Sequence, residues 1–157
     1  MSDTLFLEVI TPDKKVFCGH VSEVRFSTRH RGQYGILPGH TPLITLVGSG
    51  LLQFTIHGME HWMTLFGGIV EVRDDKVAIL ARESETVDTL DLDAIHAGRQ
   101  MAEKALREAE TEQDLEIAQV ALEQSMVRLE AVNLATLLGG PHPPRCAKCG
   151  CDSCRCS

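Results

Sequence analysis

The spacing of apolar residues changes abruptly near residue 88, and this change constrains the fold more than any other feature of the sequence. Before it, short runs of Val, Ile, Leu and Phe are separated by turn residues. In the first run, Leu5, Leu7 and Val9 alternate with their neighbours, which is the period of a β-strand with one buried face. Regularly spaced runs of this kind predict an antiparallel β-sandwich over residues 1–87.

Turn signals lie between these runs. Asp74 and Asp75 are predicted to turn the last hairpin, and residues 57–60 the one before it. His57, Glu60 and His61 are side chains that could serve in a metal or general-base site, but they surround that turn, so we interpret them as exposed turn residues. The sequence contains no P-loop and no nucleophile elbow. We therefore expect a protein that is not an enzyme, with no catalytic residues.

After residue 88 the apolar residues recur with helical spacing up to residue 138. The connection at 110–113 is so short that the two helices must form an antiparallel hairpin. The first helix is predicted to be capped by Asp91 or Asp93 and the second to begin near Thr111, Glu112 or Asp114. The predicted apolar faces are Leu92, Ile95, Ala102, Leu106 and Ala109 on the first helix, and Leu115, Ala118, Leu122, Met126, Leu129, Val132 and Leu137 on the second.

Two helices alone are marginally stable, so the hairpin at 88–138 must place its apolar face on another surface. Many residues on its faces are alanines, which keep such a contact shallow. Two arrangements stay open: a cap docked permanently on the sandwich, and a reversible docking.

The net charge is −7, and only 4% of the residues are aromatic. An acidic chain without a basic stripe is a poor ligand for phosphates, which argues against nucleic acid as a partner. No apolar run approaches the ~20 residues that a membrane-spanning helix needs, and the amino terminus lacks the basic flank of a signal peptide. We expect no direct insertion into the membrane.

Residues 139–157 are predicted to be a Pro/Gly linker and a flexible Cys-rich tail. Thiolates spaced this closely can surround zinc, although a conventional zinc module separates its cysteine pairs by many more residues. Three interpretations remain: metal binding, a disordered tail of reduced thiols, and redox or disulfide chemistry. The candidate metal ligands are Cys146, Cys149, Cys151, Cys154 and Cys156.

Two glycine-rich segments shape the sandwich. In GILPGHTPL, at residues 35–43, Pro38 and Gly39 suit the two corners of a turn, and Pro42 prevents pairing as a central strand. In LFGGIVEV, at 65–72, two glycines predict a bulge or sharp bend. With VITPDKKVFCG at 9–19 and VAILA at 77–81, these segments resemble the epsilon subunit of F-type ATP synthases, called delta in mitochondria. The resemblance covers residues 5–138.

The resemblance implies a non-catalytic rotor subunit of the central stalk, which couples ion-driven rotation of the membrane c-ring to ATP synthesis. It implies contacts with the gamma subunit and the c-ring, and with the catalytic beta subunit when the hairpin is extended. It implies no required cofactor, and a peripheral position on the cytoplasmic face of a bacterial membrane. For His40, partner contact and turn stabilisation stay open. The implied interface residues are Gln33, Ile36, Leu37, Pro38, Gly39, His40 and Pro42.

The chain departs from the family at two places in the hairpin. Relatives that sense ATP carry a motif of Ile or Leu, Asp, two variable residues, Arg and Ala; here Asp93 remains but His96 replaces the arginine, so no nucleotide site is implied. Arg128 is the only basic residue between 111 and 138, which predicts weak inhibition of ATP hydrolysis. The alternative function is a free-standing regulatory interaction module with a zinc-binding tail.

Overall fold

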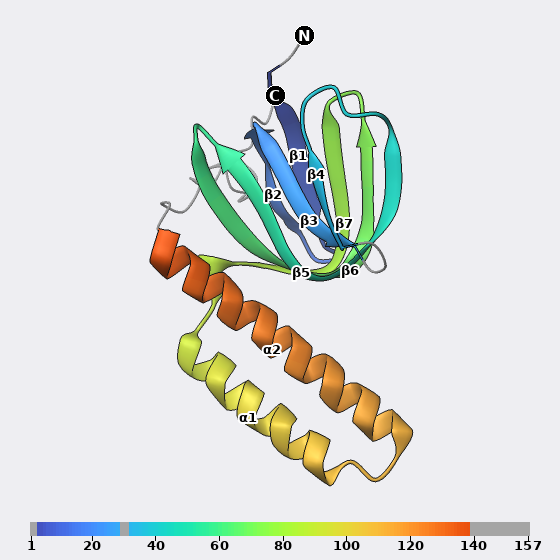
Figure 1. Ribbon diagram of the computed structural model, residues 1–157, viewed down its shortest axis with the longest axis vertical. Coiled ribbons are helices and arrows are strands. Elements are labelled where there is room, and N and C mark those ends of the chain that lie inside the picture. The colour runs from blue at the N-terminus through green and yellow to red at the C-terminus, as the bar shows by residue number, and fades with distance from the viewer. Residues whose placement is uncertain (1–2, 29–31, 139–157) are drawn as a thin grey trace.

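The computed structural model describes residues 3–28 and 32–138. A β-sandwich is followed by a helical hairpin, and Figure 1 shows the hairpin below the sandwich. This arrangement confirms the predicted fold class, whereas the predicted tail lies outside the described residues. The elements are β1 (Leu5–Ile10), β2 (Lys15–Val21), β3 (Glu23–Thr28), β4 (Gly32–Ile36), β5 (Leu43–Ile56), β6 (Met59–Arg73), β7 (Lys76–Thr86), η1 (Val87–Thr89), α1 (Leu92–Glu108) and α2 (Glu112–Leu138).

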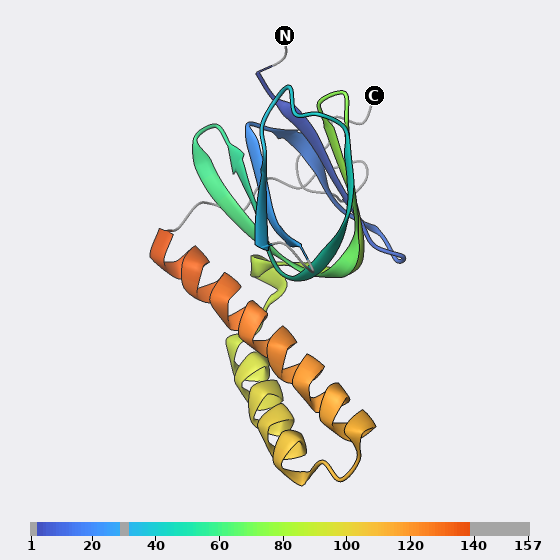
Figure 2. The ribbon, with the colours of Figure 1, turned by 45° about the vertical axis from the view of Figure 1, so that its right-hand side comes forward.

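The seven strands form one hydrogen-bonded sheet in the order β2-β1-β7-β6-β5-β3-β4. Figures 1 and 2 show that this sheet folds back on itself into two layers. Phe17, Phe26 and Phe54 are among the largest side chains fully buried between the layers. The pairs of described strands are antiparallel except for β1 and β7, which run parallel. Local patterns did not predict this pair, because its strands are far apart in the sequence.

The sheet folds back where β5 and β6 bend, and the bend depends on Gly67 and Gly68. Their φ angles are +66° and +133°, which L side chains rarely adopt. A Cβ atom on Gly68 would lie 2.1 Å from the carbonyl oxygen of Leu80. The pairing of β5 with β6 keeps its register through this region. The predicted glycine feature is therefore a bend without a bulge in this strand pair.

Two hairpins are closed by two-residue turns. His57 and Gly58 have φ angles of 49° and 78°, and Asp74 and Asp75 have φ angles of 51° and 59°. Positive φ at both positions is the mark of the type I′ turn, whose twist matches that of paired strands. The turn expected at 57–60 is shorter than predicted because β6 already begins at Met59.

Both helices begin at side-chain caps. The Asp91 carboxylate accepts a hydrogen bond from the Asp93 N–H at 3.0 Å, and the Thr111 hydroxyl accepts one from the Asp114 N–H at 3.1 Å. These caps satisfy amide groups that have no partner within the first helical turn. The predicted helix starts are confirmed. Among the described residues, no helix combines the length and apolar character needed to cross a bilayer.

The apolar face predicted for α2 is only partly correct. Ala118 is buried as predicted, but Met126 is 55% exposed and Leu137 79% exposed. Residues outside the predicted face are buried instead, namely Ser125, Val127 and Ala131. The reason is that α2 has two neighbours, since it lies between α1 and the sandwich in both views (Figures 1 and 2). A single-face pattern could not separate these two contacts.

Candidate interaction surface

The GILPGHTPL segment forms a tight loop between β4 and β5, at the end of the sandwich away from the helices (Figure 1). The His40 N–H donates to the Leu37 carbonyl at 3.1 Å, which closes a turn over Pro38 and Gly39. The φ of Gly39 is +85°, as the second corner of a type II turn requires. The Gly39 N–H donates to Asp75 Oδ1 at 2.6 Å, so the loop is tied to the β6–β7 turn.

The ring of His40 is also used within the loop. Its Nδ1 lies 2.7 Å from the Thr41 carbonyl oxygen. Because a carbonyl oxygen only accepts hydrogen bonds, Nδ1 must carry the proton and donate it. Of the two roles left open for His40, the structure shows the turn-stabilising one.

The implied interface residues do not share one environment. Ile36 is fully buried in the core, so its side chain is not available to a partner, and the expectation for this residue is wrong. Its place at the end of β4, directly before the loop, makes it an anchor of the loop instead. Leu37, in contrast, is 56% exposed. Of the others, Gln33, Gly39 and Pro42 are exposed, and Pro38 and His40 are half-buried.

An exposed apolar surface covers the outer face of the layer beside this loop. Leu46 on β5 lies opposite Ile69 on β6, Ile69 lies opposite Leu80 on β7, and Leu80 lies opposite Ile10 on β1. Leu46, Ile69 and Leu80 are 51%, 44% and 55% exposed, and Ile44, two residues before Leu46 on β5, is 74% exposed. We call these five residues the apolar row. Exposed apolar patches of this kind mark candidate interaction sites.

The apolar row was not predicted from the sequence, although the sequence carries a signal for it. A strand with one solvated face alternates apolar and polar residues. In β7, however, Ile79 is buried while its neighbour Leu80 is exposed, and in β6 Val70 is buried beside exposed Ile69. Consecutive large apolar residues in strands already assigned to a sandwich would have indicated that the outer face is apolar as well.

Charged residues lie next to the apolar row. Glu8, two residues before Ile10 on β1, forms ion pairs with Lys15 at 2.8 Å and Lys76 at 3.2 Å. The hydrogen bond from Lys15 is the main cause that lowers the pKa of the Glu8 carboxyl; burial opposes the shift and Lys76 supports it. The carboxylate is thus held ionised between two cations, which gives this edge of the row a fixed charge pattern.

The other candidate groups do not assemble into a reactive site. His57 and Glu60 are exposed, as predicted. His61 is buried and stacks on Phe54 with ring centroids 5.5 Å apart, so the interpretation of it as an exposed turn residue is wrong. Its place on β6 turns it inward, as strand alternation requires. Within the described part of the chain, no group of three His, Cys, Asp or Glu side chains could hold a metal ion.

The five tail cysteines lie outside the described residues, so zinc binding there stays a prediction. The nucleotide motif remnant lies on α1, where Asp93 and His96 are both exposed. The amide of Asp93 is already used by the cap at Asp91.

Comparison with known proteins decides the family. Residues 4–87 match the family described as ATP synthase, Delta/Epsilon chain, beta-sandwich domain. The chain belongs to the ATP synthase delta/epsilon family. Curated relatives named ATP synthase epsilon chain include one from Nitratidesulfovibrio vulgaris, 33% identical over 82% of this chain and 96% of the relative, and one from Geobacter sp. (strain M21), 34% identical over 87% and 99%. The match to epsilon chains thus extends beyond the sandwich into the hairpin.

Solved structures share the fold of this epsilon-family chain. One is a chain of the mitochondrial ATP synthase of Euglena gracilis, with a TM-score of 0.74 and 20% identity, covering 85% of this chain and 83% of that one. Another belongs to the central stalk and c-ring structure of the Tetrahymena thermophila enzyme, with a TM-score of 0.59 and 14% identity, covering 82% and 96%. At these identities the likeness establishes the fold alone.

Proposed function

We propose that this chain is a non-catalytic rotor subunit of the central stalk, which couples ion-driven rotation of a membrane c-ring to ATP synthesis. Its similarity to ATP synthase epsilon chains, which spans 82–87% of this chain, supports this role. The chain makes and breaks no bonds in this role, so it requires no cofactor. It works on the cytoplasmic face of the membrane as a peripheral part of the complex.

The apolar row carries the proposal, and its proposed partner is the gamma subunit. A subunit that turns with a shaft needs a contact that stays closed, and buried apolar area is the main source of such stability. Leu46, Ile69 and Leu80 offer that area on paired strands, which hold them rigidly in one plane. Glu8 and its two lysines add a charge pattern that fixes orientation more than affinity.

The loop at residues 37–42 is the proposed contact with the c-ring. It lies at the end of the sandwich opposite the helices, and its tie to Asp75 holds it in one shape. Leu37 is its exposed apolar contact, while Ile36 and His40 support the loop from within.

The hairpin is proposed to reach the catalytic beta subunit only when it leaves the sandwich. Arg128 is the only Lys or Arg in α2, so attraction to an acidic partner is limited. We accordingly propose that its inhibition of ATP hydrolysis is weak.

A substitution in the apolar row tests the gamma contact. Leu80→Glu places a charge at the centre of the row, and Met101→Glu, on the exposed face of α1, is a matched control because Met101 is 73% exposed. Losing one leucine contact and desolvating a carboxylate should weaken binding of the full chain to purified gamma subunit by at least about tenfold. Titration calorimetry measures this, and the control should bind like the unmodified chain.

Two outcomes would count against the proposal. If the unmodified chain does not bind gamma, the rotor role is wrong, and a chain that purifies alone with zinc would favour the regulatory module. If Leu80→Glu binds as tightly as Met101→Glu, the role can stand but the apolar row is not the contact.

A further inference from the structure

Cys18 on β2 takes part in a disulfide bond. It is the only cysteine within residues 3–28 and 32–138, the part of the chain that the structure describes. The other five cysteines of the sequence lie between residues 146 and 156. A partner for Cys18 within the same chain must therefore be one of these five.

Cys18 lies on the outer face of the sheet, away from the core. It pairs with Glu8 on β1, and further along the same face His20 pairs with Phe6, with ring centroids 5.4 Å apart. The residue before it, Phe17, belongs to the core. β2 is an edge strand and His20 is exposed, yet Cys18 is 0% exposed. Complete burial at this outward position agrees with a partner attached to the Cys18 sulfur.

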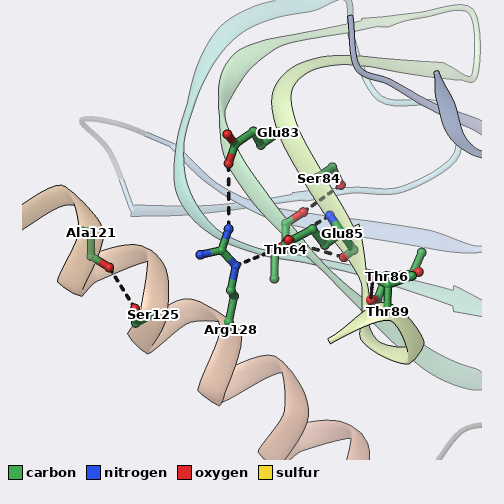
Figure 3. A network of polar contacts seen from close by, with 9 residues as sticks. All are labelled: Thr64, Glu83, Ser84, Glu85, Thr86, Thr89, Ala121, Ser125 and Arg128. Carbon is green, nitrogen blue, oxygen red and sulfur yellow. Dashed lines mark hydrogen bonds and ion pairs between the residues drawn. The ribbon is translucent and has the colours of Figure 1, made fainter. Parts of the chain in front are cut away.

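The carboxyl end of α2 lies close to the sandwich, so the tail begins near the strands. Arg128 Nε lies 2.7 Å from Glu85 Oε2 of β7, and its Nη2 lies 3.9 Å from Glu83 Oε2 (Figure 3). From there α2 continues for about 15 Å to its last residue, Leu138. The extended chain from Leu138 to Cys156 can span roughly 60 Å, about twice the diameter of a small domain. The tail is therefore long enough to reach Cys18.

Charge alone does not favour contact between the tail and this face. Residues 139–157 carry three basic side chains and one acidic side chain. Beside Cys18, the Glu8 carboxylate is already paired with Lys15 at 2.8 Å and Lys76 at 3.2 Å. A basic tail thus meets two cations and a carboxylate whose charge is compensated, and like charges repel. Attachment of the tail here therefore depends on the covalent bond.

We propose that Cys18 is the attachment site of the Cys-rich tail, and that a disulfide between Cys18 and one of the five tail cysteines holds residues 139–157 on the outer face of β1 and β2. The attached tail lies beside Ile10, at one end of the apolar row. Reduction of the bond to two thiols releases the tail. The inference concerns the isolated chain, so it does not depend on the rotor role.

The bond forms by thiol–disulfide exchange with a small-molecule disulfide of the glutathione class. A tail thiolate attacks this oxidant, which forms a mixed disulfide and releases one small thiolate. The Cys18 thiolate then attacks the tail sulfur, which forms the protein disulfide and releases the second small thiolate. The two protons of the protein thiols pass to the released thiolates, so the oxidant is reduced to two thiols. Because cytoplasmic glutathione is kept reduced, the attached state belongs to oxidising conditions.

Peptide mapping of the full chain by mass spectrometry tests the attachment. The chain is equilibrated with oxidised or reduced glutathione, its free thiols are blocked in acid, and it is digested with trypsin without reduction. Cleavage after Lys and Arg places Cys18 in peptide 16–25 and divides the tail cysteines among peptides 146–148, 149–155 and 156–157. In the oxidised chain, the unlinked form of peptide 16–25 should fall about tenfold or more as it joins a tail peptide, because the second exchange step is intramolecular.

Two controls make the mapping specific. Replacement of all five tail cysteines by serine keeps the length and charge of the tail, and should leave peptide 16–25 linked to no other peptide. An equal mixture of isotope-labelled and unlabelled chain separates a bond within one chain from a bond between two copies. A bond within one chain joins two peptides that carry the same label.

The proposal is overturned if peptide 16–25 from the oxidised chain keeps a free thiol while the tail cysteines pair only with one another. It is also overturned if linked peptides combine labelled with unlabelled chains, because the bond then joins two copies. An equal amount of the link in reduced glutathione would overturn the release of the tail on reduction. The binding of gamma is measured separately, so none of these results bears on the apolar row.

Discussion

The sandwich and the hairpin are built from similar aliphatic residues but differ in the size of the side chains that they bury. The sandwich fully buries large side chains such as Phe17, Leu52 and Ile79. The helices bury mainly small ones, with Ile95 and Val127 the largest residues buried in them. Since burial of a large aliphatic side chain contributes about 1.5–3 kcal/mol, the two parts differ widely in stability per residue.

The smaller apolar burial of the hairpin supports the proposal above that it changes its contacts while the sandwich keeps its shape. Elements that move are drawn from the least stable regions of a protein, where apolar contacts are few. Ile117 and Met126 of α2 remain exposed. A second protein surface can therefore contact α2 without unfolding the helix. Three substitutions can break or sharpen this contrast.

The largest effect is expected at the bend of the sheet. Gly68→Ala would place a Cβ atom 2.1 Å from the Leu80 carbonyl oxygen at a φ of +133°, and should lower the free energy of unfolding by about 3 kcal/mol or more. Urea denaturation followed by the fluorescence of Trp62 measures it. Gly35→Ala is the control, because its Cβ meets nothing within 4 Å. If Gly68→Ala lowers the free energy of unfolding by less than about 1 kcal/mol, the backbone at the bend can shift to accommodate a Cβ atom.

A smaller effect is expected in the hairpin. Ala131 is fully buried, so Ala131→Leu should overpack the contact and destabilise the hairpin by about 1–3 kcal/mol. Met126→Gln, on the face that the sequence pattern predicted to be buried, should change stability by no more than about 0.5 kcal/mol. Thermal unfolding followed by helical circular dichroism compares them. If both substitutions change the stability equally, the face predicted from the sequence contributes to the packing of α2 as much as the buried face does.

The smallest effect is expected at the charged edge of the apolar row. Glu8→Gln should cost about 1 kcal/mol at neutral pH, because Lys15 and Lys76 lose their shared partner. The folded state lowers the pKa of Glu8, so its stabilisation is present above the unfolded pKa and is lost as the pH falls through the folded one. Urea denaturation at pH 7 and pH 3 should show the difference shrinking in acid. A constant difference would point to packing rather than charge.

Much of the fold could be predicted because its signals are local. Gly67 with Gly68 and Asp74 with Asp75 each mark a positive-φ backbone conformation that few other residues adopt. The cap at Asp91 is marked by a side chain that can accept a hydrogen bond from a free N–H of the first helical turn. The parallel pairing of β1 with β7 has no such signal, since it joins segments about seventy residues apart. The face of α2 was predicted only in part for a related reason. Because α2 contacts both α1 and the sandwich, its buried residues do not follow one helical period.

The candidate surface was harder to predict than the fold. The sequence indicated the loop at residues 37–42 but could not show that Ile36 points into the core. The apolar row consists of residues that are distant in sequence and become neighbours only when the strands pair. Arg128 was noted as the lone cation of α2, yet only the structure reveals Glu85 opposite it.

β5 and β6 continue without interruption from one layer of the sandwich into the other, through the bend at Gly67 and Gly68. A mechanical load applied at the outer face of one layer therefore passes into the other along two covalent backbones, with their ladder of hydrogen bonds lying across the direction of pull. The two layers cannot slide past each other as separate sheets could. Stiffness of this origin does not depend on how well the side chains between the layers are packed.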